Sequence, residues 1–545
     1  MNRDLQRLAG EEFDLLVIGG GISGVTIAWD AVLRGLTVAL VDKEDFGGAT
    51  SSATGKLIHG GLRYLKNFEL GVVRESLRER RLMEFIAPHM VNPLEFVIPN
   101  YSWMDTLMLK AGMTLYDMLG FDKKKLDDPD KRIPGHRLIS RSGVLDLFPS
   151  LPQEDLKNGY VYYDCQMVSP ERLTLSFADC ANRRGVCIAN YVRVTGFNMD
   201  GEHIRATKVR DELTGDDFEI RAKVVLNATG CWGDKLLELL TRGESKTKLG
   251  RSKGIHIVIP SINDRAALGI ITKTKRHIYL LPWRGLTLCG TTDTPYRDDP
   301  DDLNIKKEEI LDFIDEINGC YPALNVQFSD VLSSYSGLRP LADPDGLIED
   351  SYDASRKHEL IDHKEEGLAD NLLSALGGKY TTSRFMAMQS VDAVMGKLGR
   401  KEFSRTDKVR LDIAPEIAMS RYRADAKGKV DGIDDALTDH LITMYGQDWR
   451  KIAEMASADP ALKEPVWDRS QEIAAQIVYA AEHEDAVHLE DAVYRRTDLC
   501  TIKVPGRDIL EKCARLMAGT LGWNEEQIAS EIERTEKKLS RKCAD

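Results

Sequence analysis

A glycine-rich turn near the N-terminus, GGGISG (19–24), constrains the fold more than any other feature of the sequence. It follows a continuous apolar run over 13–18, which is typical of a buried parallel strand. Apolar residues at helical spacing follow over 22–33, and a second short apolar run, 37–41, ends at Asp42. This order predicts a strand–helix–strand unit that binds a dinucleotide.

Each glycine of this turn has a physical task in such a unit. Gly19 permits the tight turn, Gly21 lets the backbone approach a pyrophosphate, and Gly24 lets helix and strand pack closely. The helix N-terminus offers unpaired N–H groups to the phosphates, and Asp42 can accept hydrogen bonds from ribose hydroxyls. The residues predicted to bind the cofactor here are Gly19, Gly20, Gly21, Ser23, Gly24 and Asp42.

Charge and cysteine content exclude several classes of protein. The net charge of −13 over 545 residues argues against a nucleic-acid-binding protein. The nine cysteines are scattered without a C-x-x-C pair, which predicts free thiols in a reducing compartment. No run approaches the roughly 18 apolar residues of a membrane span, and residues 1–12 lack the apolar core of a signal peptide. We expect a cytoplasmic protein, at most peripheral on the inner face of the membrane.

The rest of the chain predicts an α/β protein with a helical tail. Apolar runs at 223–230, 254–260, 277–283 and 285–293 indicate a strand-rich middle region. From residue 416 onward the periodicity is helical throughout. We therefore predict two units, residues 1–415 and an all-helical domain over 416–545.

The nature of the dinucleotide is left open by the glycine turn alone. A reductase that holds both FAD and NAD(P)H usually shows two such turns, whereas this chain has one. A strand that ends in NATG (227–230) is placed to pass close to a dinucleotide. Both observations favour FAD over NAD without deciding between them.

The stretch TSSATGKLIHGGLRYL (50–65) shows neither the helical nor the strand period. With eight other pieces it occurs in an order and spacing that resembles the FAD-dependent glycerol-3-phosphate dehydrogenases, within the D-amino-acid-oxidase-like flavoproteins. Those pieces are GGGISG, NATGCWGD, SKGIHIVIP, LPWRG, GTTD, YSGLRPL, SRKHEL and GGKYTTSR. The similarity covers about residues 13–400, and EDAVYRRT (490–497) extends it into the tail.

This resemblance implies a Rossmann-like FAD-binding domain built from discontinuous segments, an interleaved antiparallel β-sheet substrate domain, and an all-helical C-terminal domain. It implies oxidation of sn-glycerol 3-phosphate to dihydroxyacetone phosphate by hydride transfer to FAD, with electrons passed on to membrane quinone. A homodimer is a possible assembly. The loop around Ser169 and Pro170 departs from the family pattern, which leaves the exact phosphorylated polyol open.

The resemblance also assigns site residues by position. The further cofactor-binding residues it implies are Ser51, Ser52, Lys56, Leu57, His59, Ala228, Gly230, Gly377, Gly378 and Thr381. The implied substrate-binding residues are Arg63, Tyr64, Arg356 and Lys379. The implied catalytic residues are His256, in the proton step, and Arg339, in orientation and charge stabilisation.

Elementary chemistry agrees with these roles. Guanidinium groups bind phosphate oxygens in bidentate fashion, and a neutral histidine is the ordinary base for an alcohol proton. These residues also have purely structural alternatives. His256 alternates with apolar residues in a predicted strand, where a lone histidine is more often structural than catalytic. Arg339, Arg356 and Lys379 could be turn or surface charges.

Other functions remain open from the residues alone. They are a related FAD-dependent oxidase that uses oxygen, action on another phosphorylated polyol or on an amino acid, and a flavoprotein without catalytic activity. The stretch 102–119, followed by Lys123–Lys125, fits either a core-facing helix or an interfacial helix that meets quinone at the membrane, and the core-facing helix is the commoner case.

Overall fold

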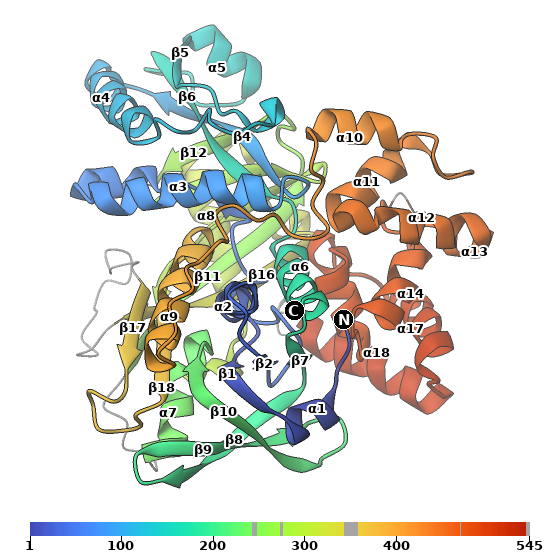
Figure 1. The fold of residues 1–545 in the computed structure, drawn as a ribbon. Helices are drawn as coiled ribbons and strands as arrows, with labels where there is room; N and C mark the ends of the chain where they lie inside the picture. Colours follow the sequence, from blue (N-terminus) through green and yellow to red (C-terminus); the bar gives the residue numbers. More distant parts are fainter. Residues whose placement is uncertain (242–247, 273–275, 343–357, 469, 541–545) are drawn as a thin grey trace.

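The computed structural model describes residues 1–241, 248–272, 276–342, 358–468 and 470–540. Figure 1 shows two β-sheets with helices packed against them and a separate group of helices along one side. The mixed α/β fold with a helical C-terminal region confirms the predicted fold class.

The first sheet is the predicted dinucleotide-binding sheet. Its four central pairings are parallel, β18–β10, β10–β1, β1–β2 and β2–β7, while β17 is antiparallel to β18. In spatial order the strands are β17 (His358–Asp362), β18 (Leu372–Gly377), β10 (Asp217–Asn227), β1 (Glu12–Ile18), β2 (Val38–Val41) and β7 (Cys187–Ala189). The strands β8 (Val192–Asp200) and β9 (His203–Asp211) extend β10 in antiparallel fashion.

Helix α2 (Ile22–Leu33) is buried along nearly its whole length, because it packs against α6 (Pro170–Arg183) and α9 (Ser383–Lys397). The Trp29 ring meets Phe177 of α6 edge to face at 5.3 Å. A core of mainly aliphatic side chains joins these helices to the sheet. The glycine turn is thus anchored in the largest core of the protein, which holds it rigid.

The second sheet is mainly antiparallel and is woven from segments that alternate along the chain with those of the first. In spatial order it contains β15 (Thr294–Pro295), β11 (Leu249–Pro260), β14 (Leu286–Gly290), β13 (His277–Trp283), β12 (Ala266–Ile271), β4 (Val91–Asn100), β6 (Asn158–Met167) and β3 (Leu57–Ile58). The strand β16 (Ser333–Ala342) pairs with β11, and β5 (Arg137–Ser140) pairs with β6. This is the predicted interleaved substrate sheet.

The remaining helices of the first 400 residues lie around the two sheets. They are α1 (Leu5–Gly10), α3 (Leu70–Ile86), α4 (Trp103–Leu119), α5 (Arg141–Leu147), α7 (Gly233–Thr241) and α8 (Lys307–Cys320). Short 3-10 turns include η1 (Leu62–Asn67), η3 (Gly230–Trp232) and η7 (Tyr380–Thr382).

The core-facing interpretation of 102–119 accounts for only part of α4. Only Met113 and Tyr116 of this helix are buried, while five large apolar side chains stay 64–70 % exposed. They are Trp103, Met104, Leu107, Met108 and Met118. Within the described residues, no helix is both long enough and apolar enough to cross a membrane.

The described part of the chain from 398 to 540 contains helices and no strand. The helices are α10 (Met419–Ala426), α11 (Asp435–Tyr445), α12 (Trp449–Ala458), α13 (Pro460–Lys463), α14 (Ala474–His483), α15 (Leu489–Asp491), α16 (Leu499–Ile502), α17 (Arg507–Leu521) and α18 (Glu525–Ser540), with a π-helix, η9 (Ala492–Arg496). The boundary between 415 and 416 stays a prediction.

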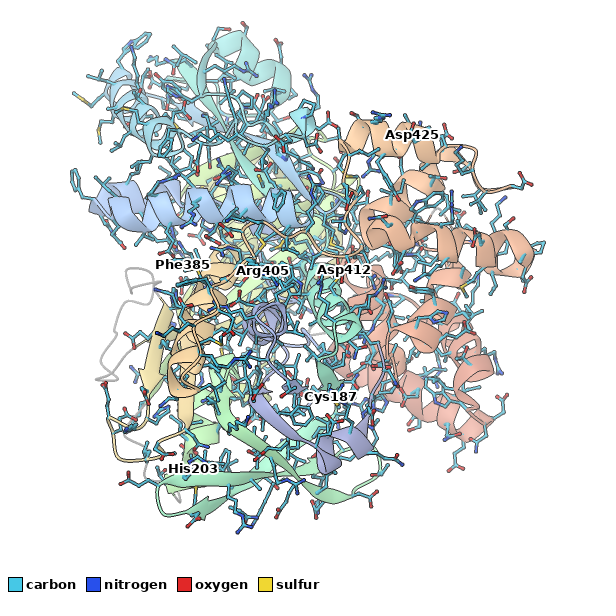
Figure 2. All side chains as sticks on the ribbon, viewed as in Figure 1. Cys187, His203, Phe385, Arg405, Asp412 and Asp425 are labelled. Atoms are coloured by element: carbon cyan, nitrogen blue, oxygen red, sulfur yellow. The ribbon has the colours of Figure 1, made fainter. Side chains whose placement is uncertain are left out.

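The connection into these helices follows the first domain closely. Leu411, Ile413 and Ala414 belong to the core around α2. Figure 2 labels Asp412 in this connection, and its carboxylate accepts a hydrogen bond from Arg184, at the end of α6, at 3.1 Å. The helical region is therefore held against the first sheet from its start.

Candidate cofactor and substrate site

A cavity of about 700 Å³ lies at the carboxyl ends of the parallel strands. The loops that follow β1, β2, β10 and β18 all line it, as expected for a ligand site in a parallel sheet. The loop 48–54, the first residues of β8, helix α7 and the turn 299–301 also contribute to the lining.

The glycine turn has the close contacts that its spacing predicts. Gly19 has φ of 106°, and a Cβ there would lie 2.6 Å from the carbonyl oxygen of Ala228. A Cβ at Gly24 would lie 1.8 Å from the carbonyl oxygen of Gly19. Gly21 is the N-cap of α2, and its own residue type leaves the helix without a side-chain cap. The cavity therefore meets a helix N-terminus through bare backbone, which suits a pyrophosphate.

Asp42 lines the cavity and also holds the glycine turn. Its carboxylate accepts hydrogen bonds from the backbone N–H of Gly20 at 2.6 Å and of Glu44 at 2.9 Å. Burial raises the pKa of Asp42 to about 6. The carboxylate is thus poised to titrate near neutral pH.

The loop 48–54 closes the cavity from the side of the second sheet. The Ser51 hydroxyl accepts a hydrogen bond from the N–H of Ile22 at 2.8 Å, and Thr50 donates to the carbonyl of Leu338 at 2.6 Å. Ser52 donates to the carbonyl of Ala49 and shapes the turn from outside the cavity. This loop therefore joins the glycine turn to β16.

After this loop, the side chains of Lys56, Leu57 and His59 do not line the cavity. The Lys56 ammonium is buried 3.2 Å from both carboxylate oxygens of Glu171 and 4.7 Å from the centre of the Trp283 ring. Leu57 enters β3, and the N–H of His59 donates to the Thr381 hydroxyl at 3.2 Å.

Three predicted substrate residues lie together beside the cavity. The Tyr64 ring is covered by the Arg63 guanidinium at 4.9 Å and by the Lys379 ammonium at 4.7 Å. Lys379 lines the cavity and donates to the Ser76 hydroxyl of α3 at 2.7 Å, while burial lowers its pKa. Two cations therefore meet at this end of the cavity. Arg356 lies outside the described residues.

The two predicted catalytic residues share one face of the second sheet. The register pairs His256 with Tyr335 and Ser252 with Arg339, so both side chains leave the sheet on the same side. The His256 ring stacks on Tyr335 at 4.9 Å, and Tyr335 donates to the carbonyl of Thr54 at 2.8 Å. This face is therefore turned toward the loop 48–54.

The electrostatic surroundings of His256 keep its ring neutral. Burial, with Arg339 and Lys56 nearby, lowers its pKa to about 3. Its Nδ1 has no hydrogen-bond partner among the described residues. The Arg339 guanidinium donates to the Thr291 hydroxyl at 2.9 Å and lies 3.4 Å from the Asp293 carboxylate.

The cavity thus brings together part of the predicted site. Of the predicted residues, those that line it are Gly19, Gly21, Ser23, Asp42, Ser51, Ala228, Gly230, Gly377, Gly378 and Lys379. Those that lie beside or behind it are Gly20, Gly24, Ser52, Lys56, Leu57, His59, Arg63, Tyr64, His256, Arg339 and Thr381. Their contact with a ligand stays a prediction.

Several lining residues were missed by sequence reasoning. They include the segment 192–195, Cys231, Trp232, Lys235 and Asp301. The short apolar run 186–189 was the available signal for 192–195, because most of it, Cys187–Ala189, forms the parallel strand β7 beside β2. Asp301 accepts from the indole N–H of Trp232 at 2.9 Å, a pairing across the chain that no local pattern announces.

The cavity fits an extended dinucleotide. A crowded glycine turn, a helix N-terminus with glycine at its N-cap, the Asp42 carboxylate and a glycine pair, Gly377–Gly378, contribute to its lining. Both of these last glycines have positive φ, which side chains rarely adopt, and they leave backbone against the cavity.

Comparisons with known proteins agree with this fit. The family described as FAD dependent oxidoreductase matches residues 14–378, and the C-terminal domain of alpha-glycerophosphate oxidase matches 398–528. A glycerol-3-phosphate dehydrogenase of Synechocystis sp. is 35% identical over 99% of both chains. The mitochondrial glycerol-3-phosphate dehydrogenase of Homo sapiens is 32% identical over 97% of this chain and 73% of its own.

Solved structures give the same result. The glycerol-3-phosphate dehydrogenase from Bacillus halodurans, complexed with FAD, has a TM-score of 0.79 and 27% identity over 98% of this chain and 96% of that chain. Glycine oxidase from Bacillus cereus, at 19% identity and a TM-score of 0.52 over 72% of this chain and 96% of that one, shares the fold alone. The protein is an FAD-dependent oxidoreductase, and it belongs to the family of FAD-dependent glycerol-3-phosphate dehydrogenases.

Proposed function

We propose that this protein oxidises sn-glycerol 3-phosphate to dihydroxyacetone phosphate and passes the electrons to quinone. The observation that supports this substrate is a pair of cations, Arg63 and Lys379, which both lie over the Tyr64 ring. Lys379 also lines the cavity. FAD, when bound, supplies the acceptor for the hydride. Substrate binding and the proton step fall to side chains of this chain.

Binding of the phosphate is assigned to the two cations. A phosphate monoester carries nearly two negative charges at neutral pH, and the planar guanidinium of Arg63 suits its oxygens. Burial of Lys379 lowers the pKa of its ammonium, so an incoming dianion strengthens the charged form.

The proton step is assigned to His256. Burial lowers its pKa to about 3, so the ring is a weak base that is neutral at physiological pH, the form in which it can accept the proton of the substrate hydroxyl. A Cβ at Gly55 would lie 3.4 Å from Nε2, so this nitrogen faces the loop that borders the cavity. Arg339, on the same face of the sheet, would stabilise the negative charge that develops on the oxygen.

Anaerobic mixing of the purified, FAD-loaded protein with glycerol 3-phosphate tests this proposal. Loss of the flavin absorbance near saturating substrate is the expected result. Glycerol and glycine serve as matched substrates that lack the phosphate. No bleaching by glycerol 3-phosphate, or bleaching by glycine alone, would reject the proposal and favour the amino-acid alternative.

Peripheral contact with an anionic membrane is part of the proposal, and α4 carries it. Its exposed apolar side chains from Trp103 to Met118 are accompanied by the exposed ammonium groups of Lys110, Lys124 and Lys125. Apolar residues bordered by lysines match the composition of a helix that lies in an anionic bilayer surface. In Figure 1, α4 projects at the margin of the molecule.

Co-sedimentation with vesicles tests this contact. Vesicles of anionic lipid should bind the protein, and vesicles of zwitterionic lipid should bind it weakly. Leu107→Glu should abolish binding, while Leu138→Glu, at an exposed leucine outside α4, should not.

Two further experiments test the electron acceptor and the oligomeric state. Reoxidation of the reduced enzyme by a soluble quinone, compared with reoxidation by oxygen, identifies the acceptor. Sedimentation without vesicles separates a monomer from a homodimer.

A further inference from the structure

One segment of the C-terminal helices holds two of the loops that line the cavity. The loop 42–48 follows β2, and the segment 190–195, which follows β7, is here called the second loop although it enters β8 at Val192. The segment 491–496, at the end of α15 and along the π-helix η9, reaches both from behind. Figure 1 shows the helices α14 to α18 gathered beside the β2 and β7 edge of the sheet.

The first attachment is a buried ion cluster at Asp45. The Arg496 guanidinium donates to both carboxylate oxygens of Asp45, at 2.9 Å to Oδ1, and Arg495 donates to Oδ2. Asn190 donates to Oδ1 at 3.0 Å. Although burial opposes it, the two arginines hold the pKa of Asp45 below its ordinary value. Asp45 is therefore a buried anion, held in place by two guanidinium groups.

The loop that carries Asp45 cannot move without moving the glycine turn. The N–H of Gly47 donates to the carbonyl of Gly20 at 3.0 Å. Phe46 packs directly under Gly20, where a Cβ would lie 2.3 Å from the ring. Any shift of Asp45 is thus transmitted to the backbone that faces the pyrophosphate position.

The second attachment is a hydrogen bond from the Tyr191 hydroxyl to Asp491 at 2.6 Å. Tyr191 has φ of 56°, a conformation that is rare for an aromatic residue and persists where the surroundings enforce it. Its own N–H donates to the carbonyl of Glu44 at 3.1 Å, so the two loops are also joined to each other. Asp491 also accepts a hydrogen bond from Arg495, so the two attachments form one network.

Neither arginine lines the cavity, whereas Asp45 and residues 192–195 do. We propose that Asp491, Arg495 and Arg496 are positioning residues for FAD: the helical domain sets the two loops that cradle the nucleotide without touching it. Retention of FAD, rather than chemistry on the substrate, is the property that this network controls. The inference requires only FAD as cofactor and is independent of which substrate is oxidised.

Release of FAD from the full-length holoenzyme tests the proposal. The rise of free flavin fluorescence after dilution gives the dissociation rate. Arg496→Met should release FAD roughly tenfold faster, which corresponds to about 1.4 kcal/mol. Tyr191→Phe, which removes one hydroxyl at the second attachment, should accelerate release less.

Arg172→Met is the matched control. Arg172 is equally buried, lies on α6 against the same helical domain, and donates to both oxygens of Glu484 at 2.8 and 2.7 Å. Its described hydrogen-bond partners outside its own helix, Glu484 and Met444, lie away from the cavity. Arg172 shares Glu484 with Arg496, but it binds the carboxylate, whereas Arg496 donates to the backbone carbonyl at 2.7 Å. We expect Arg172→Met to lower the melting temperature as Arg496→Met does, with FAD release near the wild-type rate.

Equal release from Arg172→Met and Arg496→Met would overturn the proposal, because domain docking in general would then explain it. If Arg496→Met yields no holoenzyme, Arg496→Lys and Tyr191→Phe decide. Faster release from either variant supports the positioning role, and wild-type release from both overturns it.

Discussion

The two ends of the cavity are built in different ways. The nucleotide end comes from one continuous unit, in which β1, the glycine turn, α2 and β2 follow each other directly. The predicted substrate end, where Lys379 lines the cavity and Arg63, His256 and Arg339 lie beside or behind it, is assembled from the turn after β18, η1, β11 and β16. The first end therefore depends on local sterics and the second on long-range register.

This difference predicts where each end is fragile. A local cradle fails when a single atom is added, because backbone already fills the space. An assembled site tolerates small changes in shape but loses rate when one functional group is removed. The predictions below compare the two ends, from the largest effect to the smallest.

Gly24→Ala should have the largest effect and abolish FAD binding. The added Cβ would lie 1.8 Å from the carbonyl of Gly19, so the helix and the strand must separate. Overpacking of this kind costs about 1–3 kcal/mol or more. Gly112→Ala in α4 is the control, because nothing lies within 4 Å of its Cβ position. The flavin absorbance of the purified variants measures the outcome, and full FAD content in Gly24→Ala would contradict a sterically closed turn.

His256→Gln should slow flavin reduction by glycerol 3-phosphate by about a hundredfold to ten-thousandfold, the range for a lost general base. FAD content should stay normal, because His256 lies outside the nucleotide end. His89 is a matched control, since it is also buried with its pKa lowered to about 3. His89→Gln should change stability alone. Stopped-flow absorbance measures both variants, and equal rates would remove His256 from the proton step.

Asp164→Asn should raise the KM for glycerol 3-phosphate by roughly tenfold while FAD release stays unchanged. The Asp164 carboxylate accepts hydrogen bonds from the N–H of Gly60 at 2.9 Å, from Arg80 at 2.6 Å and from Tyr116 at 2.8 Å. It therefore fixes the chain that leads to Arg63, and charge-assisted bonds of this kind contribute about 1.5–3 kcal/mol. Tyr116→Phe removes one of the three bonds and should raise KM less. Steady-state kinetics measure both variants, and an unchanged KM in Asp164→Asn would show that Gly60 needs no such support.

The same contrast explains what the sequence could predict. The glycine turn, α2 over 22–33 and the strands around 223–230 and 254–260 follow from local periodicity, and the structure contains them. Strands β4, β6 and β16 were not recognised, because they are defined by their partners in the second sheet. Motif order placed His256 and Arg339 as candidates, but only the register of β11 and β16 shows that they share a face.

Lys56 shows what a position in a motif does not predict. Its contact with the cofactor stays a prediction, and the structure adds that its ammonium is buried against Glu171. Glu171 lies on α6, far along the chain, and no local signal pairs the two residues. The helical tail was predicted as a separate domain, yet its attachment through Asp45 depends on contacts between residues 450 positions apart.

The two ends should also differ in how their contributions to folding stability depend on pH. This effect is the smallest of those predicted here, but its sign is opposite at the two ends. Burial raises the folded pKa of Asp42 to about 6, above its ordinary value of 3.8. Its contribution to stability is present at low pH and is lost as pH rises through 6. Burial lowers the folded pKa of His256 to about 3, below its ordinary value of 6.5. Its contribution is present above 6.5 and is lost as pH falls through 3.

Between pH 5 and 8, therefore, Asp42 titrates and His256 does not. Protonation of Asp42 removes an acceptor for ribose hydroxyls, so FAD release should accelerate a few-fold as pH falls through about 6. Asp42→Asn should release FAD at one rate across this range, because it cannot ionise. Flavin reduction at saturating substrate should show no step from His256. Fluorescence-detected release at several pH values measures the first effect, and a step near pH 6 that persists in Asp42→Asn would place the titrating group elsewhere.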